Sequence, residues 1–237
     1  MDALLLHAGI ADSRMWAPQV EALEAAGHSV VAPDLPGYGD AALERGELSY
    51  VDVAASHLSG PAAVVGCSFG GRIALELAVD RPELVERLVL VGAGLGSWDW
   101  SEETQADFAE EEALLEQGDL AGAAAQQARM WLAPDATVAA RELTEAMTLR
   151  SYEQQLPMEE LVTATWPQPP AAERLAEIAV PTLVVVGTAD LADIRAMADR
   201  LASHIPGARL ERIEGAGHLP SFERPDELNR LLLDFLR

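Results

Sequence analysis

A serine, a histidine and an acid stand in this chain at positions that suit nucleophilic catalysis. Ser68 is at the centre of the segment Gly66–Gly70, with a glycine two residues to either side. A serine hydroxyl needs a base to take its proton, and that base needs a carboxylate to hold its tautomer. His218 lies in a glycine-rich segment, and Asp190 follows an apolar run. The order Ser68, Asp190, His218 is the order expected for a serine on a G-x-S-x-G turn.

Two further acids compete with Asp190 for the place beside the histidine. Asp193 lies three residues after it, and Asp99 follows another apolar run, residues 87–91. A parallel sheet places its site beyond the carboxyl ends of the strands, so all three positions are suitable. The choice among them depends on geometry.

The residues on either side of Ser68 predict a strand, a sharp turn and a helix. An apolar run, residues 62–65, precedes the turn, and a helix-like run, residues 71–78, follows it. A turn this tight needs small residues beside its apex, because a Cβ atom there would collide with neighbouring backbone. The turn lifts the serine oxygen above the sheet, near the positive end of the following helix. Cys67 lies beside the apex, but only the central residue points into a pocket, so we expect no catalysis by its thiol.

Short β-branched runs alternate with helical patterns along most of the chain, which predicts βαβ units and a parallel sheet. The expected strands lie near residues 3–7, 29–33, 62–66, 87–91, 181–187 and 208–213. The expected helices lie near residues 17–26, 50–58, 69–80, 191–203 and 225–236. The last helix has the clearest apolar periodicity, and Pro225 marks its start.

Residues 97–172 break this alternation. They hold 15 acidic residues against three arginines, and four of the five tryptophans of the chain. Their pattern is helical with no convincing strand. We therefore expect a helical lid at 97–172, inserted into a core formed by residues 1–96 and 173–237. The alternative is a solvated helical appendage with its own small core.

Composition narrows the class of protein further. The formal net charge is -23, and all sixteen basic residues are arginine. Nucleic acids and anionic membranes need a basic surface, so we expect neither as a partner. A single cysteine leaves no disulfide or cysteine-based metal cluster and suits a reducing cytoplasm. We expect no membrane span, no signal peptide, no metal and no organic cofactor.

Taken together, these features resemble the α/β-hydrolase fold superfamily, and most closely its lid-bearing bacterial esterase and 3-oxoadipate enol-lactonase-like branch. The residues that carry the resemblance are Leu6-His7-Ala8-Gly9 before Arg14-Met15-Trp16, Asp34-Leu35-Pro36-Gly37-Tyr38-Gly39, the turn at Ser68, Gly187-Thr188-Ala189-Asp190, and Gly217-His218-Leu219-Pro220 followed by Glu223-Arg224-Pro225.

The resemblance implies a role for each catalytic position. Ser68 would be the nucleophile, His218 the general base and acid, and Asp190 the group that orients it. The backbone N–H groups of Gly9 and Phe69 would form the oxyanion hole. Further side chains expected at the pocket are Ile10, Trp98, Trp131, Trp166 and Leu219.

The chain departs from the family pattern in two places. The usual His-Gly pair reads His7-Ala8, which places a methyl group near the oxyanion loop, and we expect a structural role for His7. The two leading antiparallel strands of the family have no counterpart, so the fold class expected is α/β with about six mostly or fully parallel strands. Residues 29–33 would then lie at an edge of the sheet, where a second copy of the chain could pair.

The function implied by the resemblance is hydrolysis of a small ester, lactone or related acyl substrate through an acyl-enzyme. Four alternatives use the same fold and residues: a lyase similar to that of menaquinone biosynthesis, a carbon–carbon bond hydrolase, a perhydrolase, and a ligand receptor with little turnover. The acidic segment 97–172 predicts a preference for neutral small-molecule substrates, although salt screens its charge beyond about 8–10 Å.

Overall fold

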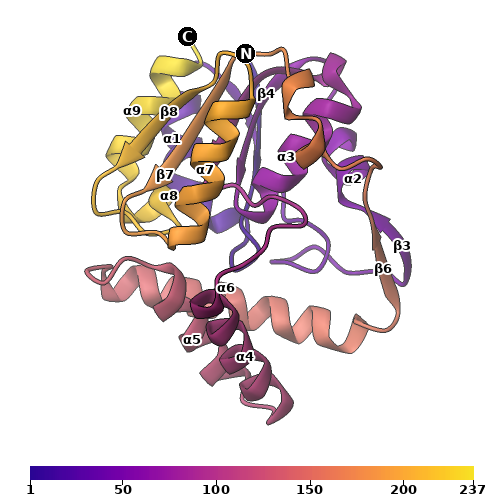
Figure 1. Cartoon of the computed structure of the whole chain (residues 1–237), viewed down its shortest axis with the longest axis vertical. Helices are drawn as coiled ribbons and strands as arrows, with labels where there is room; N and C mark the ends of the chain where they lie inside the picture. The colour runs from indigo at the N-terminus through magenta and orange to yellow at the C-terminus, as the bar shows by residue number, and fades with distance from the viewer.

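A six-stranded parallel sheet forms the centre of the computed structural model, which describes residues 1–237 (Figure 1). The strands are β1 (Asp2–Leu6), β2 (Ser29–Val31), β4 (Ala62–Cys67), β5 (Val85–Val91), β7 (Thr182–Gly187) and β8 (Arg209–Ile213). Their order across the sheet is β2-β1-β4-β5-β7-β8, and every neighbouring pair is parallel. The six expected parallel strands, with β2 at an edge, are confirmed. Pairing of a second copy along β2 stays a prediction.

Helices cover both faces of this sheet. On one face lie α1 (Ala17–Ala25) and α9 (Pro225–Phe235), and on the other lie α2 (Tyr50–Ser56), α3 (Phe69–Asp80) and α7 (Ala192–His204). Alternate residues of β1 divide between the two layers: Leu4 and Leu6 pack with α3 and α7, whereas Ala3 and Leu5 pack with α1 and α9. Burial on both faces explains why these strands read as continuous apolar runs.

A second group of helices lies apart from both faces, gathered beyond one end of the sheet in Figure 1. It consists of α4 (Glu102–Glu116), α5 (Leu120–Trp131) and α6 (Val138–Gln155). Each begins at a polar capping residue: Ser101, Asp119 and Thr137 accept a hydrogen bond from the third residue along. These helices lie within the segment 97–172.

The expectation that residues 97–172 contain no strand is wrong. A short strand, β6 (Val162–Thr165), pairs in parallel with β3 (Gly46–Ser49) and ties the chain that leaves α6 to the start of α2. Val162, Thr163 and Thr165 are β-branched residues that suit a strand. The strand has only four residues and is partly exposed, so it leaves no clear alternation of apolar and polar positions.

The remaining helical elements are short. They are the four-residue α8 (Pro220–Glu223) and the 3-10 turns Ser13–Trp16, Pro82–Leu84, Leu156–Met158, Ala171–Glu173 and Leu175–Glu177. None of the helices is long and apolar enough to cross a membrane.

Candidate active site

Ser68 sits at the apex of a sharp turn between β4 and α3. Its φ and ψ are 50° and -110°, so a residue with a Cβ is held in a region that side chains rarely adopt. The turn is fixed from both sides, because the Ser68 N–H donates to the carbonyl of Val91 at 3.0 Å and its carbonyl accepts from Gly94 at 3.1 Å. Strain maintained by its surroundings is typical of functional sites.

The glycines of this turn are required by close backbone approach. A Cβ on Gly66 would lie 2.2 Å from the carbonyl oxygen of Gly70, and one on Gly70 would lie 2.2 Å from that of Leu6. A Cβ on Gly71 would lie 2.5 Å from the Cβ of Ala93. The turn therefore places α3 directly against β1 and the chain after β5, which positions Ser68 over the carboxyl end of the sheet.

His218 and Asp190 form a buried pair. The Nδ1 of His218 lies 2.8 Å from Oδ2 of Asp190, and each side chain is 1% exposed. The other carboxylate oxygen accepts the N–H of Leu191 at 2.8 Å, which fixes the plane of the carboxylate. Because a carboxylate accepts, Nδ1 carries the proton and Nε2 has the free lone pair. That Nε2 is buried and makes no hydrogen bond, either to Ser68 or to any other group.

The two rival acids lie elsewhere. Asp193 accepts hydrogen bonds from Trp98 Nε1 at 3.1 Å, Ser101 Oγ at 2.7 Å and Thr104 Oγ1 at 2.6 Å, so it anchors the start of α4. Burial acts to raise the pKa of Asp193, but these hydrogen bonds outweigh it and lower the pKa below its ordinary value. Asp99 is exposed. Of the three acids, the structure brings only Asp190 to His218.

Gly9 and Phe69, the two residues expected to form an oxyanion hole, lie next to each other. A Cβ on Gly9 would be 3.5 Å from the Cβ of Phe69. The N–H groups of Gly9 and Phe69 donate none of the backbone hydrogen bonds found in turns and loops. Phe69 is the first residue of α3, and the first N–H groups of a helix have no partner within the helix. The Ala8 methyl group is fully buried in the core shared with α1 and α9, so it is accommodated away from these donors.

His7 holds the loop that carries Gly9 in place through three hydrogen bonds. Its Nδ1 lies 2.8 Å from the carbonyl of Ala8, its Nε2 accepts the N–H of Leu35 at 2.9 Å, and its own carbonyl accepts the N–H of Gly70 at 3.0 Å. Burial lowers the pKa of His7, so the ring is neutral with its proton on Nδ1. These bonds join the loop that carries Gly9 to the Ser68 turn.

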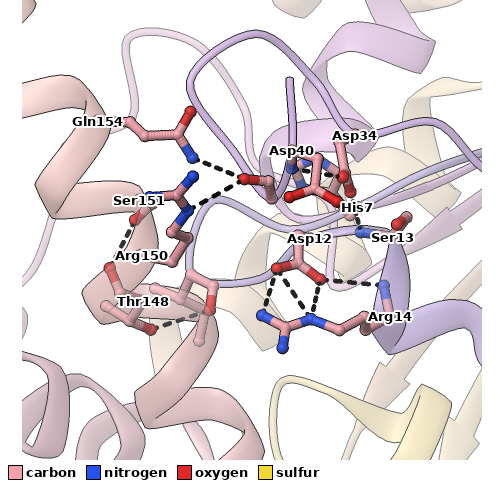
Figure 2. Close-up of polar contacts among 12 residues, drawn as sticks. His7, Asp12, Ser13, Arg14, Asp34, Asp40, Thr148, Arg150, Ser151 and Gln154 are labelled. Carbon is pink, nitrogen blue, oxygen red and sulfur yellow. Dashed lines mark hydrogen bonds and ion pairs between the residues drawn. The ribbon is translucent and has the colours of Figure 1, made fainter. Parts of the chain in front are cut away.

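A second set of polar contacts fixes the neighbouring loops, as Figure 2 shows. Asp34 accepts the N–H groups of Ser13 at 2.8 Å and Asp40 at 2.9 Å, and Asp12 pairs with Arg14. From α6, the Thr148 hydroxyl donates to the carbonyl of Ile10 at 2.9 Å. The helical group is thereby bonded directly to the loop that carries Gly9.

A cavity of about 320 Å³ opens beside Ser68, between the core and the helical group. Of the expected pocket residues, Trp98 and Trp131 line it. Leu219 does not, because it is fully buried in the core, and Trp166 and Ile10 are also outside the lining. The other lining residues are Phe69, Arg72, Gly94, Leu95, Gly96, Ser97, Trp100, Phe108 and Ile194.

Trp131, the last residue of α5, joins this cavity to the histidine. Its ring lies 4.3 Å from the imidazole of His218, centroid to centroid, and its carbonyl accepts the His218 N–H at 2.8 Å. A Cβ on Gly217 would lie 2.4 Å from the Ala133 nitrogen, so the chain just after α5 packs closely against the loop that carries His218. The position of the helical group and the position of His218 are therefore coupled.

Glu223 is a site residue that sequence reasoning missed. Its carboxylate accepts three backbone N–H groups, from Ala133 at 2.8 Å, Gly217 at 3.1 Å and Leu219 at 2.9 Å. It thus holds the loop on both sides of His218 and fastens the end of α5 to it. The only sign of this role in the sequence is that Glu223 lies five residues after His218. An acid just before Pro225 is, however, also typical of the start of a helix.

No cluster of three or more histidine, cysteine or acidic side chains is arranged to hold a metal ion. Cys67 is buried and its sulfur lies 3.7 Å from the carbonyl oxygen of His218, beneath the turn rather than in the cavity. Burial raises the pKa of this thiol well above its ordinary value, which keeps it protonated.

Comparison with known proteins assigns the family. Residues 3–231 match the model of the alpha/beta hydrolase family, so the chain belongs to that family. It is 28% identical to a pimeloyl-[acyl-carrier protein] methyl ester esterase of Aromatoleum aromaticum, over 100% of this chain and 98% of the relative. It is 30% identical to a 2-hydroxy-6-oxononadienedioate/2-hydroxy-6-oxononatrienedioate hydrolase of Burkholderia vietnamiensis, over 99% of this chain and 86% of the relative.

Among solved structures, a thermophilic esterase from Thermogutta terrifontis, with malate bound, has the same fold. The TM-score is 0.80 at 23% sequence identity, over 100% of this chain and 89% of that one. The expected α/β-hydrolase fold is confirmed, and the relatives support an enzyme of the hydrolase class.

Proposed function

We propose that the chain is a serine hydrolase that cleaves a small ester, lactone or related acyl substrate through an acyl-enzyme. The observation that carries the proposal is the buried bond between His218 Nδ1 and Asp190 Oδ2, which leaves the unpartnered Nε2 as the base for Ser68. The name of the Aromatoleum relative, a methyl ester esterase, supports ester hydrolysis. A cavity of about 320 Å³ suits a small substrate.

The chemistry follows from these positions. The Ser68 Oγ attacks the substrate carbonyl carbon while its proton passes to His218 Nε2, and the Asp190 carboxylate stabilises the imidazolium. The N–H groups of Gly9 and Phe69 bind the oxyanion, and one such donor is worth about 2.7–4 kcal/mol in a known enzyme. The imidazolium then protonates the leaving oxygen. Water repeats the cycle on the acyl-enzyme and releases the acid.

The helices α4, α5 and α6 act in this proposal as a lid over the cavity. Trp98 and Trp131 of the lid segment line the cavity, and Asp193 and Glu223 of the core hold the two ends of the α4–α5 pair. By covering the cavity, the lid would shield the reacting groups from water and so strengthen the charge interactions of the reaction. The lid segment supplies five of the twelve residues that line the cavity, so it would help to distinguish one substrate from another.

The test compares serine variants in hydrolysis of ethyl butyrate, followed by acid release. Ser68→Ala is expected to lower kcat at least about 1000-fold, because the nucleophile of such a triad acts as a unit with its base. Ser97→Ala is the matched control: Ser97 lines the same cavity and also has a positive φ, but it lies outside the turn between β4 and α3. The kcat of Ser97→Ala should fall by no more than about tenfold. Equal losses in the two variants would contradict the proposal.

A further inference from the structure

Arg72 lies in the same cavity as Ser68 and one helical turn further along α3. Its N–H donates to the carbonyl of Ser68 at 3.0 Å, in the first turn of the helix. Residues four apart share a helix face and are displaced by about 6 Å along the axis. A group bound by the Arg72 side chain would therefore be only a few bonds away from a carbonyl held at Ser68.

The guanidinium of Arg72 is held in place by an aromatic surface. Its Cζ lies 3.7 Å from the ring centroid of Trp166, within the range of a cation–π contact. Trp166 is itself fixed, because its ring stacks on Tyr50 and packs against Phe69. Gly96 also lies beside the guanidinium, because a Cβ there would be 3.5 Å from both Nε and Nη2 of Arg72.

This guanidinium has no anionic partner. The chain carries 39 acidic side chains, yet none of its ion pairs includes Arg72 and no hydrogen bond is made by its side chain. Its Nε is buried without any acceptor. The nearest acid along α3, Glu76, uses its carboxylate to accept the N–H of Ala171 at 2.9 Å.

Burying such a group is costly. Burial lowers the pKa of Arg72, against the effect of the Glu76 charge, but an arginine remains protonated at all physiological pH values. A partly buried cation without a hydrogen-bond acceptor is unfavourable for folding. Such an arrangement is expected where a ligand supplies the missing acceptor.

We propose that Arg72 binds a carboxylate of the substrate, so that the enzyme acts on acyl compounds with a carboxylate a few bonds from the scissile carbonyl. Half-esters of short dicarboxylic acids are the simplest members of this class. The flat guanidinium presents two parallel N–H groups that match a carboxylate. This inference rests on the proposed function and names its substrate class.

The acidic lid does not remove this preference. Its charges act at long range and are screened by salt beyond about 8–10 Å, whereas Arg72 would contact the carboxylate directly inside the cavity. The neutral substrates expected from the charge of residues 97–172 are therefore replaced, in this inference, by anionic ones.

The experiment uses pairs of esters of the same shape. Monoethyl succinate differs from ethyl butyrate, and monoethyl glutarate from ethyl valerate, by a carboxylate in place of a methyl group. The ratio of kcat/KM for the two members of each pair is measured in the wild type and in Arg72→Leu, Arg72→Lys and Arg200→Leu. Arg200 is the matched control, because it is exposed and lines a neighbouring cavity that shares Gly96 and Trp98.

The wild type is expected to prefer the half-ester, and Arg72→Leu to lower the kcat/KM ratio at least about 30-fold, as for loss of a buried charged contact. Arg72→Lys should fall in between, because it keeps the charge but not the two-pronged geometry. Arg200→Leu should change the ratio by no more than about threefold, since exposed charges contribute little.

A second measurement does not depend on turnover. In a Ser68→Ala background, binding of glutarate is followed by tryptophan fluorescence, because Trp166 stacks on the guanidinium. Adding Arg72→Leu should weaken glutarate binding at least about tenfold. Circular dichroism shows whether each variant is folded. If Arg72→Leu is not folded, glutarate binding is compared between the wild-type arginine and Arg72→Lys instead.

The outcomes separate the two proposals. Hydrolysis that persists in Ser68→Ala would overturn the proposed function. Hydrolysis that depends on Ser68, with the same half-ester ratio in Arg72→Leu as in the wild type, would overturn the role of Arg72 alone. Glutarate binding that is unchanged by Arg72→Leu would also overturn it.

Discussion

Replacing Asp190 and Asp193 separately by asparagine distinguishes the two acids by different observables. The two carboxylates are three residues apart and both buried, yet they contact different parts of the molecule. Asp190→Asn should remove activity with a modest effect on folding. Asp193→Asn should weaken the attachment of helix α4 to the core and leave most of the chemistry intact.

The size of the first effect follows from the hydrogen bonds of Asp190. One carboxylate oxygen accepts the Leu191 N–H, so the asparagine oxygen is expected to take that place and to turn its NH₂ towards His218 Nδ1. A donor there favours the tautomer with the proton on Nε2, which cannot accept the serine proton. The corresponding change in a known serine protease lowers kcat about 10⁴-fold, and we expect a loss of about this size.

The size of the second effect follows from the four donors around Asp193: the Trp98 indole N–H bonds to Oδ1, the Ser101 and Thr104 hydroxyls bond to Oδ2, and the Ser101 N–H lies near both oxygens. The hydroxyls of Ser101 and Thr104 can rotate to accept from an amide, but the indole N–H of Trp98 cannot. In Asp193→Asn the amide oxygen can keep the Trp98 N–H while the NH₂ donates to the two hydroxyls, so charge-assisted hydrogen bonds become neutral ones, at a cost of about 1 kcal/mol of unfolding free energy. The rate of hydrolysis should fall less than about tenfold.

The assay measures kcat and KM with ethyl butyrate and unfolding by urea, for the wild type and both variants. The reasoning is refuted if Asp193→Asn abolishes kcat while remaining folded and Asp190→Asn retains it. Asp193 would then be the acid, and the buried pair of Asp190 and His218 would be structural.

Three further predictions concern residues that position the site. Glu223→Gln leaves one of three backbone donors without an acceptor, so kcat should fall and unfolding free energy should drop by about 1–3 kcal/mol; unchanged kinetics and urea midpoint would contradict this. Gly70→Ala forces a Cβ to within 2.2 Å of the Leu6 oxygen and should lower the melting temperature sharply, whereas Gly60→Ala, with nothing within 4 Å, should not; equal melting temperatures would show that the turn relaxes freely. Burial lowers the pKa of His7, so as the pH falls the imidazole is protonated in the unfolded chain before it is protonated in the folded one. Between about pH 7.5 and pH 5.5 the wild type should therefore lose unfolding free energy relative to His7→Gln. The loss is up to about 1.4 kcal/mol per pH unit below the ordinary pKa of about 6.5. Urea unfolding at the two pH values measures this, and parallel losses in both proteins would exclude it.

The sequence predicted the sheet well, because its strands are buried on both faces and read as apolar runs such as residues 62–67. The turn at Ser68 was also predictable, since close backbone contacts restrict Gly66 and Gly70 to glycine. The strand β6 was not predicted, because its four residues are partly exposed and its partner, β3, lies far away in the sequence.

The site was predictable where local motifs determine it and not where contacts from distant segments do. Asp190 and Asp193 could not be separated, because only the folded structure shows that Asp193 faces α4. The role of Glu223 depends on N–H groups from Ala133, Gly217 and Leu219, which meet only when helices α4 to α6 pack on the core. Arg72 was not predicted as a site residue, because only the folded structure shows that it lines the cavity and that its guanidinium has no ion-pair partner.

The most direct test of the central proposal, a nucleophilic serine at position 68, is covalent labelling with a fluorophosphonate followed by mass spectrometry. Trypsin cleaves this lysine-free chain after arginine, so Ser68 falls on the peptide that follows Arg45 and ends at Arg72, and Ser97 on a different one. The wild type is expected to gain one adduct, located by fragmentation at Ser68, and Ser68→Ala to gain none. An equal adduct in Ser68→Ala, or no adduct in the folded wild type, would contradict the proposal.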